Sequence, residues 1–194
     1  RERIKINGKE IPEDLVVDFV AKHKHLLEEI EPSFFEMTVA MAFDYFANEK
    51  VDIAVIETGL GGRLDSTNVI MPELSVITNI SYDHMNMLGN TLEEIAYEKA
   101  GIIKQNIPVV IGKSQPESAT VFVKKAIEQN APIYFADAEI TKEEIDTDDS
   151  LLHLKLKYLN AEMEVTSPLT ANYQKENIAT VFFAIQQLRE QGYT

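Results

Sequence analysis

The sequence predicts an α/β fold, with a mostly parallel sheet flanked by helices and a small antiparallel β portion. Runs of apolar, largely β-branched residues at 51–56, 74–80 and 107–111 are typical of strands buried on both faces of a parallel sheet. Segments with a helical spacing of apolar residues lie beside these runs. Alternation of helix and buried strand is the pattern of a parallel α/β sheet.

The N-terminal part of the chain is expected to form a short strand and turn followed by two helices. Residues 1–11 alternate around a turn, and a helix is predicted for 13–29. Ser33 and Glu36 form an S-x-x-E capping box, which predicts a second helix that reaches about Asn48. Because the chain starts abruptly, we interpret it as the interior of a longer polypeptide.

The middle of the chain should supply the parallel strands and their helices. Thr91 and Glu94 form a second capping box, for a helix that ends near Gly101. The other elements predicted after the strand at 74–80 are a strand at 107–111, a helix at 117–129 and a strand at 132–135.

The C-terminal part is expected to hold a loop, a hairpin and a helix. Residues 137–149 include seven acidic residues and one lysine, and we predict a solvated loop there. Residues 151–158 and 162–166 alternate like an antiparallel hairpin around Asn160. A final helix is predicted for 172–190, and its apolar face consists of Ile178, Val181, Phe182, Ile185 and Leu188.

Composition limits the classes of protein that fit. The 194 residues are ample for one well-buried domain and marginal for two. A net charge of -14 argues against nucleic acid or an anionic membrane as a general partner, although local amides and metal ions can still hold a nucleotide. No apolar run approaches the roughly 18 residues that a membrane span needs. With zero cysteines, disulfides and thiolate metal sites are excluded. We expect a cytoplasmic protein.

Two metal-capable residues follow predicted strands. Glu57 stands where the strand at 51–56 opens into a glycine loop, and His84 follows the strand at 74–80. Ligands of open parallel sheets bind beyond the carboxyl ends of the strands, so both residues are candidates for one site. The alternatives are a capping or salt-bridging carboxylate and a hydrogen-bonded loop histidine.

Lys99 interrupts an apolar stripe on the predicted helix that follows. The stripe consists of Leu92, Ile95, Ala96, Ile102 and Ile103. Burial lowers the pKa of a lysine and favours the neutral amine, which can react with carbon dioxide to give a carbamate. A carbamate offers the oxygen ligands that Mg²⁺ prefers. Alternatively, this lysine reaches solvent from the edge of the stripe, or pairs with Glu57.

The chain contains no complete nucleotide-binding loop. The run from Gly59 to Arg63 offers backbone freedom and a guanidinium, but Leu64 occupies the third glycine position of a dinucleotide fingerprint. The run from Gly112 to Ser114 is similar to the end of a phosphate-binding loop, but Ile107 stands where the first glycine is required. We reject both as nucleotide loops.

Several motifs, in order, resemble the folylpolyglutamate synthase / dihydrofolate synthase family of the Mur-ligase superfamily. They are RERIKINGKEI, SFFEMTVAMAFDYF, ETGLGGRLDSTN, the later DH, EKAGIIK and LTANYQKENIAT, and together they cover nearly the whole chain. Ala171 and Tyr173 stand where relatives often have glycine and histidine. The resemblance implies the central, P-loop NTPase-like domain of an ATP-dependent amide ligase.

The resemblance also implies substrates and residue roles. ATP would phosphorylate a carboxylate of dihydropteroate or of a folate γ-glutamyl tail, and L-glutamate would attack the acyl phosphate. Glu57, His84 and a carbamylated Lys99 are similar to the family's catalytic Mg²⁺ ligands. Pterin-side substrate contacts are implied for Phe35, Glu36, Leu64, Asp65 and Ser66, and adenine-facing contacts for Asn177 and Gln174.

The family's phosphate-binding loop and small C-terminal domain have no counterpart in residues 1–194. We therefore expect this chain to be part of a central ATP-binding domain, inactive alone, in a parent enzyme that is a monomer. Two alternatives stay open. One is another Mur-type ligase, acting on a peptidoglycan precursor or a polyamide. The other is a nucleotide-binding or regulatory domain that has lost catalysis.

Overall fold

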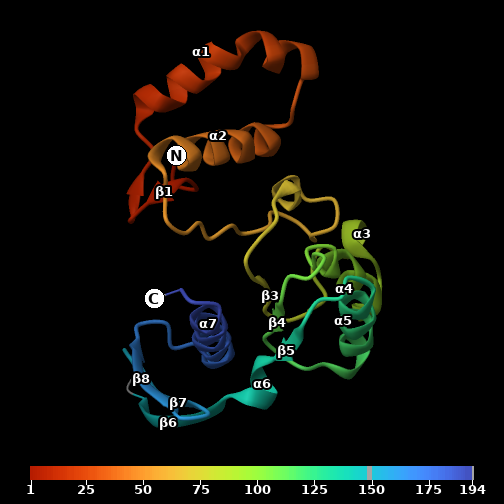
Figure 1. Ribbon diagram of the computed structural model, residues 1–194, viewed down its shortest axis with the longest axis vertical. Coiled ribbons are helices and arrows are strands. Elements are labelled where there is room, and N and C mark those ends of the chain that lie inside the picture. Colours follow the sequence, from red (N-terminus) through yellow and green to blue (C-terminus); the bar gives the residue numbers. More distant parts are fainter. Residues whose placement is uncertain (148–149, 194) are drawn as a thin grey trace. The chain divides into compact units, whose positions relative to one another are not determined.

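A computed structural model describes residues 1–147 and 150–193 (Figure 1). The chain divides into two compact units. The first contains Arg1–Leu60 and Asp65–Val69, and the second contains Gly61–Leu64 and Ile70–Thr194. The α/β fold predicted from the sequence is confirmed, and its parallel sheet lies entirely in the second unit.

The first unit is a hairpin with two helices. Strands β1 (Lys5–Ile6) and β2 (Lys9–Glu10) pair antiparallel. Asn7 and Gly8, which connect them, both have positive φ, as a tight hairpin turn requires. Helices α1 (Glu13–Ile30) and α2 (Phe34–Glu49) follow, and the 3-10 helix η1 (Ser66–Val69) packs against α2. The core of this unit is formed by Ile4, Ile11, Phe19 and Met41.

The capping box of α2 is confirmed. The Ser33 hydroxyl accepts a hydrogen bond from the Glu36 amide at 3.2 Å, and the Glu36 carboxylate accepts one from the Ser33 amide at 2.7 Å. These two bonds satisfy amides that the first helical turn leaves without partners.

The strand predicted for residues 51–56 is wrong. These residues form no helix or strand, and they pair with no strand in the described part of the chain. Ile53 and Val55 are exposed, Val55 to 92%. An apolar, β-branched run favours extended backbone, but a strand also needs a neighbour that completes its hydrogen bonds.

The parallel sheet has the order β3–β4–β5, from β3 (Ser75–Ile77), β4 (Val109–Ile111) and β5 (Ile133–Phe135). Val76 pairs with Val110, and Val110 with Tyr134. All three residues of the central strand are buried. Helices α4 (Leu92–Ala100) and α5 (Pro116–Glu128) pack against each other, and the short α3 (Met85–Leu88) precedes α4 (Figure 1).

The acidic segment 137–149 is not the loop that we predicted. Its described residues form the end of α6 (Ala136–Glu139) and strand β6 (Thr141–Thr147), whereas 148–149 lie outside the described residues. Strand β6 pairs antiparallel with β7 (Leu152–Tyr158), which pairs with β8 (Ala161–Ser167). Pairing with β7 overrides the low strand propensity of acidic residues.

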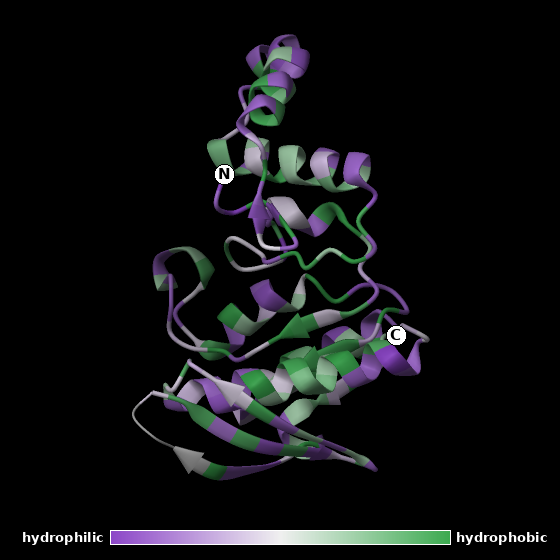
Figure 2. Cartoon of the chain, turned by 90° about the vertical axis from the view of Figure 1, so that its left-hand side faces the viewer, coloured by the Kyte–Doolittle hydropathy of each residue, from purple (hydrophilic) through white to green (hydrophobic). Residues whose placement is uncertain are grey.

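The hairpin of β7 and β8 is confirmed. Apolar and polar residues alternate along these strands, as the colours at the bottom of Figure 2 show. Leu152, Leu154 and Leu156 are buried, so one face of this sheet contributes to the core of the second unit.

Helix α7 (Asn172–Glu190) is confirmed, but its predicted buried face is partly wrong. Val181 and Ile185 are exposed, whereas Phe182, Phe183 and Ala179 are buried with residues of β4 and β7. The helix is covered on two sides, so a single apolar stripe does not describe it. Across the described ranges, no helix is both long and apolar enough to cross a membrane.

Candidate active site

The carboxyl ends of the parallel strands meet the first half of α7. Gly112 follows β4, and a Cβ at this position would lie 2.4 Å from the Thr78 carbonyl oxygen and 2.5 Å from the Thr180 hydroxyl. Only a glycine fits there without a shift of backbone. Strand β3, strand β4 and helix α7 therefore touch at one point of this edge.

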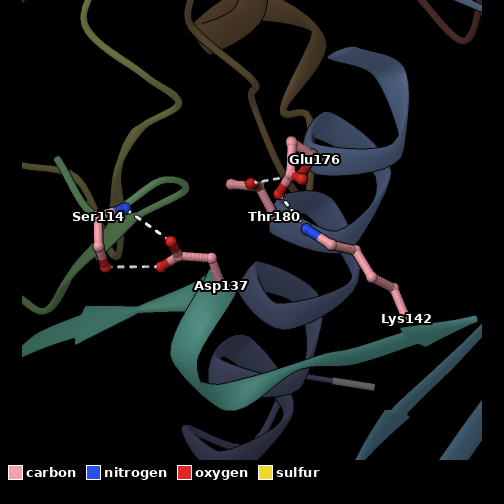
Figure 3. Close-up of polar contacts among 5 residues, drawn as sticks. All are labelled: Ser114, Asp137, Lys142, Glu176 and Thr180. Atoms are coloured by element: carbon pink, nitrogen blue, oxygen red, sulfur yellow. Dashed lines mark hydrogen bonds and ion pairs between the residues drawn. The ribbon is translucent and has the colours of Figure 1, made fainter. Parts of the chain in front are cut away.

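Two polar contacts hold the neighbouring segments (Figure 3). The Asp137 carboxylate accepts hydrogen bonds from the Ser114 amide at 2.8 Å and the Ser114 hydroxyl at 2.7 Å. Lys142 of β6 forms an ion pair with Glu176 of α7, whose carbonyl accepts a 2.8 Å bond from Thr180. The edge is thus built from polar groups that fix one another.

His84 lies beyond the end of β3, at the N-terminus of α3. Its side chain is exposed, and its backbone has the left-handed conformation with φ 49°. The imidazole Nε2 is 3.7 Å from an Asp83 carboxylate oxygen. Left-handed backbone is uncommon for residues other than glycine, although histidine is among the residues that adopt it more often.

Lys99 lies near the C-terminus of α4 and is half-buried. Its ammonium makes no hydrogen bond or ion pair with any residue that the structure describes. Ile95 and Ala96 of the predicted stripe are fully buried, and Ile103 is nearly so. The predicted stripe is therefore buried in part, because Leu92 and Ile102 are half-buried like Lys99.

The glycine loop packs directly on this end of α4. A Cβ on Gly62 would lie 2.9 Å from the Glu98 carbonyl oxygen and 3.0 Å from that of Lys99. A Cβ on Gly101 would lie 2.2 Å from the Cα of Arg63. Both glycines are therefore needed for the close approach of loop and helix. The Arg63 guanidinium forms an ion pair with Glu98 at 3.0 Å and lies 5.6 Å from the centre of the Tyr97 ring.

Glu57 belongs to the first unit, whereas His84 and Lys99 belong to the second. The Glu57 side chain is exposed and has no hydrogen-bond partner among residues 1–147 and 150–193. In the described ranges, the Glu57 carboxylate and the Lys99 ammonium make no hydrogen bond or ion pair, and the His84 imidazole is paired only with the adjacent Asp83. A carboxylate and an imidazole can bind a divalent cation as they stand, and the lysine could do so only as a carbamate.

The described residues include no group of three or more histidine, cysteine, aspartate or glutamate side chains that could hold a metal ion. The predicted ligand set has only two side chains of those types. Its chemistry fits Mg²⁺ only if Lys99 supplies an anionic oxygen.

The predicted pterin-side residues of the first unit lie close together. The Phe35 ring covers Gly59, where a Cβ would lie 2.4 Å from the Cζ atom of the ring. The Asp65 carboxylate accepts hydrogen bonds from the amide of Leu60 at 2.8 Å and from the amide of Thr67 at 2.9 Å. Phe35 and Asp65 thus hold the two ends of the Gly59–Leu60 segment.

The Asp65 carboxylate is an internal acceptor of this loop. Burial would raise its pKa, but hydrogen bonds from the Thr67 hydroxyl and from the amides of Leu60, Thr67 and Gly59 together hold the pKa below its ordinary value. Glu36 is likewise engaged, because its hydrogen bonds with the side chain and backbone of Ser33 lower its pKa. Leu64 is exposed, and Ser66 begins η1.

Asn177 and Gln174 lie one turn apart on α7, and the Asn177 amide donates to the Gln174 carbonyl oxygen at 3.2 Å. Both are half-buried.

An open hollow of about 510 Å³ in the second unit is lined by Met87–Asn90 and by Glu93, Glu94, Tyr97 and Glu98. None of the predicted site residues lines it, and its carboxylates would repel an anionic ligand.

Sequence reasoning missed Gln115 and the bond between Ser114 and Asp137. Gln115 exchanges two hydrogen bonds with the backbone of Ile80, each of 2.8 Å. The available signal was a polar residue at the start of a helix, directly after a predicted strand. That signal is weak, because glutamine at such a position is ordinarily solvated.

A parallel sheet with helices packed against it makes this an α/β domain, a class in which ligands bind at the carboxyl edge of the sheet. The chain belongs to the Mur ligase middle domain family, whose model matches residues 17–185. It is 50% identical over 138 residues to the dihydrofolate synthase/folylpolyglutamate synthase of Bacillus subtilis. The aligned residues make up 68% of this chain and 32% of that protein.

Solved structures agree with this relationship. The folylpolyglutamate synthase of Thermotoga maritima matches with a TM-score of 0.86 and 34% identity, over 100% of this chain and 45% of that one. An FPGS–AMPPCP–folate complex matches with a TM-score of 0.91 and 33% identity, over 98% of this chain and 48% of that one. The chain thus spans about a third of the curated relative and about half of the solved chains.

Proposed function

We propose that the complete protein is an ATP-dependent carboxylate–amine ligase that adds L-glutamate to dihydropteroate, to the γ-glutamyl tail of folates, or to both. The observation that carries this proposal is the 50% identity to the Bacillus subtilis dihydrofolate synthase/folylpolyglutamate synthase. The match to a complex that holds AMPPCP and folate supports both substrate classes.

Residues 1–194 would supply part of the central ATP-binding domain of this enzyme. The phosphate-binding loop and a small C-terminal domain would come from other parts of the protein, so this chain alone would not turn over substrate. We further propose a cytoplasmic, monomeric enzyme.

Glu57, His84 and Lys99 would hold Mg²⁺. The Lys99 amine would attack carbon dioxide, forming an N–C bond and losing a proton, and the carbamate would supply an anionic oxygen. Its half-buried position and its unpaired ammonium within the described residues support this role. Bound Mg²⁺ would neutralise charge that develops on the transferred phosphoryl group.

The reaction would pass through an acyl phosphate. A carboxylate oxygen of the pterin substrate attacks the γ-phosphorus of ATP, and ADP leaves. The amine of L-glutamate then attacks the acyl carbon, the amide forms, and phosphate leaves with loss of a proton from nitrogen.

The residues of this chain would position the two substrates. The Phe35 ring would stack on the pterin, while Glu36, Leu64, Asp65 and Ser66 would shape the surrounding loop. Asn177 and Gln174 carry amides that could bond the adenine edge, and their mutual hydrogen bond holds them in one orientation.

Product formation decides among the candidate activities. The complete protein would be incubated with ATP, Mg²⁺, labelled glutamate and either dihydropteroate or tetrahydrofolate, with a peptidoglycan precursor as the competing acceptor. Glutamate transfer to a pterin supports the proposal, and transfer only to the peptidoglycan precursor would assign another Mur-type ligase. ATP binding without any amide product would indicate a domain that has lost catalysis.

The metal site has its own test. Glu57→Gln should weaken apparent Mg²⁺ affinity by about 10- to 100-fold, whereas Glu49→Gln, at the exposed end of α2, should not.

A further inference from the structure

The loop that follows β4 is held in place by contacts with the segment after β3, with α6 and with α7. Gly112 is packed between the Thr78 carbonyl and the Thr180 hydroxyl, and Ser114 donates two hydrogen bonds to Asp137 (Figure 3). Gln115 ends this loop and begins α5, because its carbonyl accepts bonds from the amides of Ser118 and Ala119. Its backbone position is therefore determined on both sides.

The side chain of Gln115 binds both peptide groups of one residue in the segment after β3. Its carbonyl oxygen accepts from the Ile80 amide, and its amide group donates to the Ile80 carbonyl, each at 2.8 Å. Ile80 is only 3% exposed and lies outside any strand. Buried backbone groups need hydrogen-bond partners, and the Gln115 side chain supplies the two partners that a neighbouring strand would otherwise supply to Ile80.

Ile80 lies four residues before His84. The intervening residues 81–83 are exposed. On the other side, the His84 carbonyl accepts bonds from the amides of Met87 and Leu88, and Leu88 is buried. The imidazole is therefore carried on a short exposed segment between two fixed points, Ile80 and α3.

We infer that Gln115 is a positioning residue for His84: by binding the Ile80 backbone it fixes the segment that presents the imidazole to a divalent cation. This inference rests on the proposed role of His84 as a magnesium ligand. Without the two bonds, the segment from Ile80 to His84 gains freedom that cation binding must remove. Residues that orient a metal ligand typically contribute 10- to 100-fold to metal affinity, and we expect a loss of about that size.

Two variants separate positioning from simple loss of structure. Gln115→Ala removes both hydrogen bonds. Gln115→Glu keeps the shape and the acceptor but places a carboxylate oxygen against the Ile80 carbonyl. Gln129→Ala is the matched control, because Gln129 ends the same helix and its side chain makes no hydrogen bond among the described residues.

The complete protein is used for two measurements. Amide hydrogen exchange of the metal-free protein reports the freedom of residues 79–84, and titration with Mg²⁺ in the presence of a non-hydrolysable ATP analogue reports cation affinity. We expect Q115A to exchange faster in this segment and to bind Mg²⁺ about 10- to 100-fold more weakly. Q115E should lie between Q115A and the wild type, and it decides the question if Q115A does not fold. Q129A should match the wild type.

Unchanged Mg²⁺ affinity in folded Q115A or Q115E would overturn the inference, provided that His84→Ala weakens binding. If His84→Ala leaves Mg²⁺ affinity unchanged, the proposed metal site is wrong, and the role of Gln115 falls with it. The two failures are therefore distinguishable.

Discussion

The guanidinium of Arg63 and the carboxylate of Glu98 form a forked ion pair that ties the glycine loop to helix α4. The Arg63 Nη2 atom lies 3.0 Å from Glu98 Oε1, and Nε lies 3.2 Å from each carboxylate oxygen. The Arg63 amide also donates to the Glu98 carbonyl at 2.8 Å. Side chain and backbone thus hold the loop at the end of the helix that carries Lys99.

Glu98→Gln should lower thermal stability at low salt and much less at high salt. The substitution keeps the side-chain shape but removes the charge that pairs with Arg63, and salt screens exposed pairs. Hydrogen bonding to Glu98 raises the pKa of Arg63, so the arginine stays charged across the accessible pH range. We expect a difference in Tm of about 2–4 °C between wild type and variant at about 0.01 M salt. Glu93→Gln, exposed on the same helix, is the control, and an equal loss in both variants would contradict this prediction.

Lys99→Arg should reduce ligase activity of the complete protein by at least about 100-fold, because a guanidinium keeps the positive charge but cannot form a carbamate. Lys124→Arg, an exposed lysine of α5, should be silent. Carbon-13 NMR with labelled bicarbonate should show a carbamate signal in the wild type and none in the Lys99 variant. A fully active K99R would remove the carbamate from the proposed site.

Asp65→Asn should destabilise the chain and flatten its acid sensitivity. The pKa of Asp65 is lowered from 3.8 in the folded protein. The stabilisation from its ionised form is therefore complete above the unfolded value, near 3.8, and is lost as the pH falls through the lower folded value. Loss of hydrogen bonds to a charged group should cost about 1–3 kcal/mol at neutral pH. Urea denaturation between about pH 2 and 7 measures both effects, and parallel curves for the two proteins would contradict the assignment.

Asn177→Ala should raise the KM for ATP of the complete protein by about tenfold, with a smaller change in kcat. The variant removes an amide proposed to face adenine, a group that does not react, so it should affect binding more than chemistry. Asn160→Ala, in the exposed turn between β7 and β8, is the control. An unchanged KM for ATP would place the adenine elsewhere.

Local sequence signals predicted the elements whose stability is local. Ser33 with Glu36 and Thr91 with Glu94 each form the capping box that their spacing predicts. Residues 107–111 and 132–135 were predicted as strands because they are short apolar runs, and each contains a strand of the parallel sheet. Interactions within a few residues of the chain suffice to predict such features.

Long-range partners decided the rest. The run 51–56 has the composition of a strand but has no strand beside it among the described residues. The acidic segment that forms β6 has a composition of low strand propensity, but it pairs with β7. Gln115 is 35 residues from Ile80, and nothing in the spacing of the two predicts their contact.

The sequence by itself determined the fold class, the family and the identity of the residues that could carry chemistry, because periodicity, capping and motif order are properties of the chain. Only the tertiary structure decided which polar side chains are used to hold the molecule together, such as Asp65, Arg63 and Gln115, and which stay unpaired, such as Lys99 within the described residues. The physical reason is that a polar group acquires its hydrogen-bond partner when distant segments of the chain pack together, and the composition of a segment does not predict which segment that is.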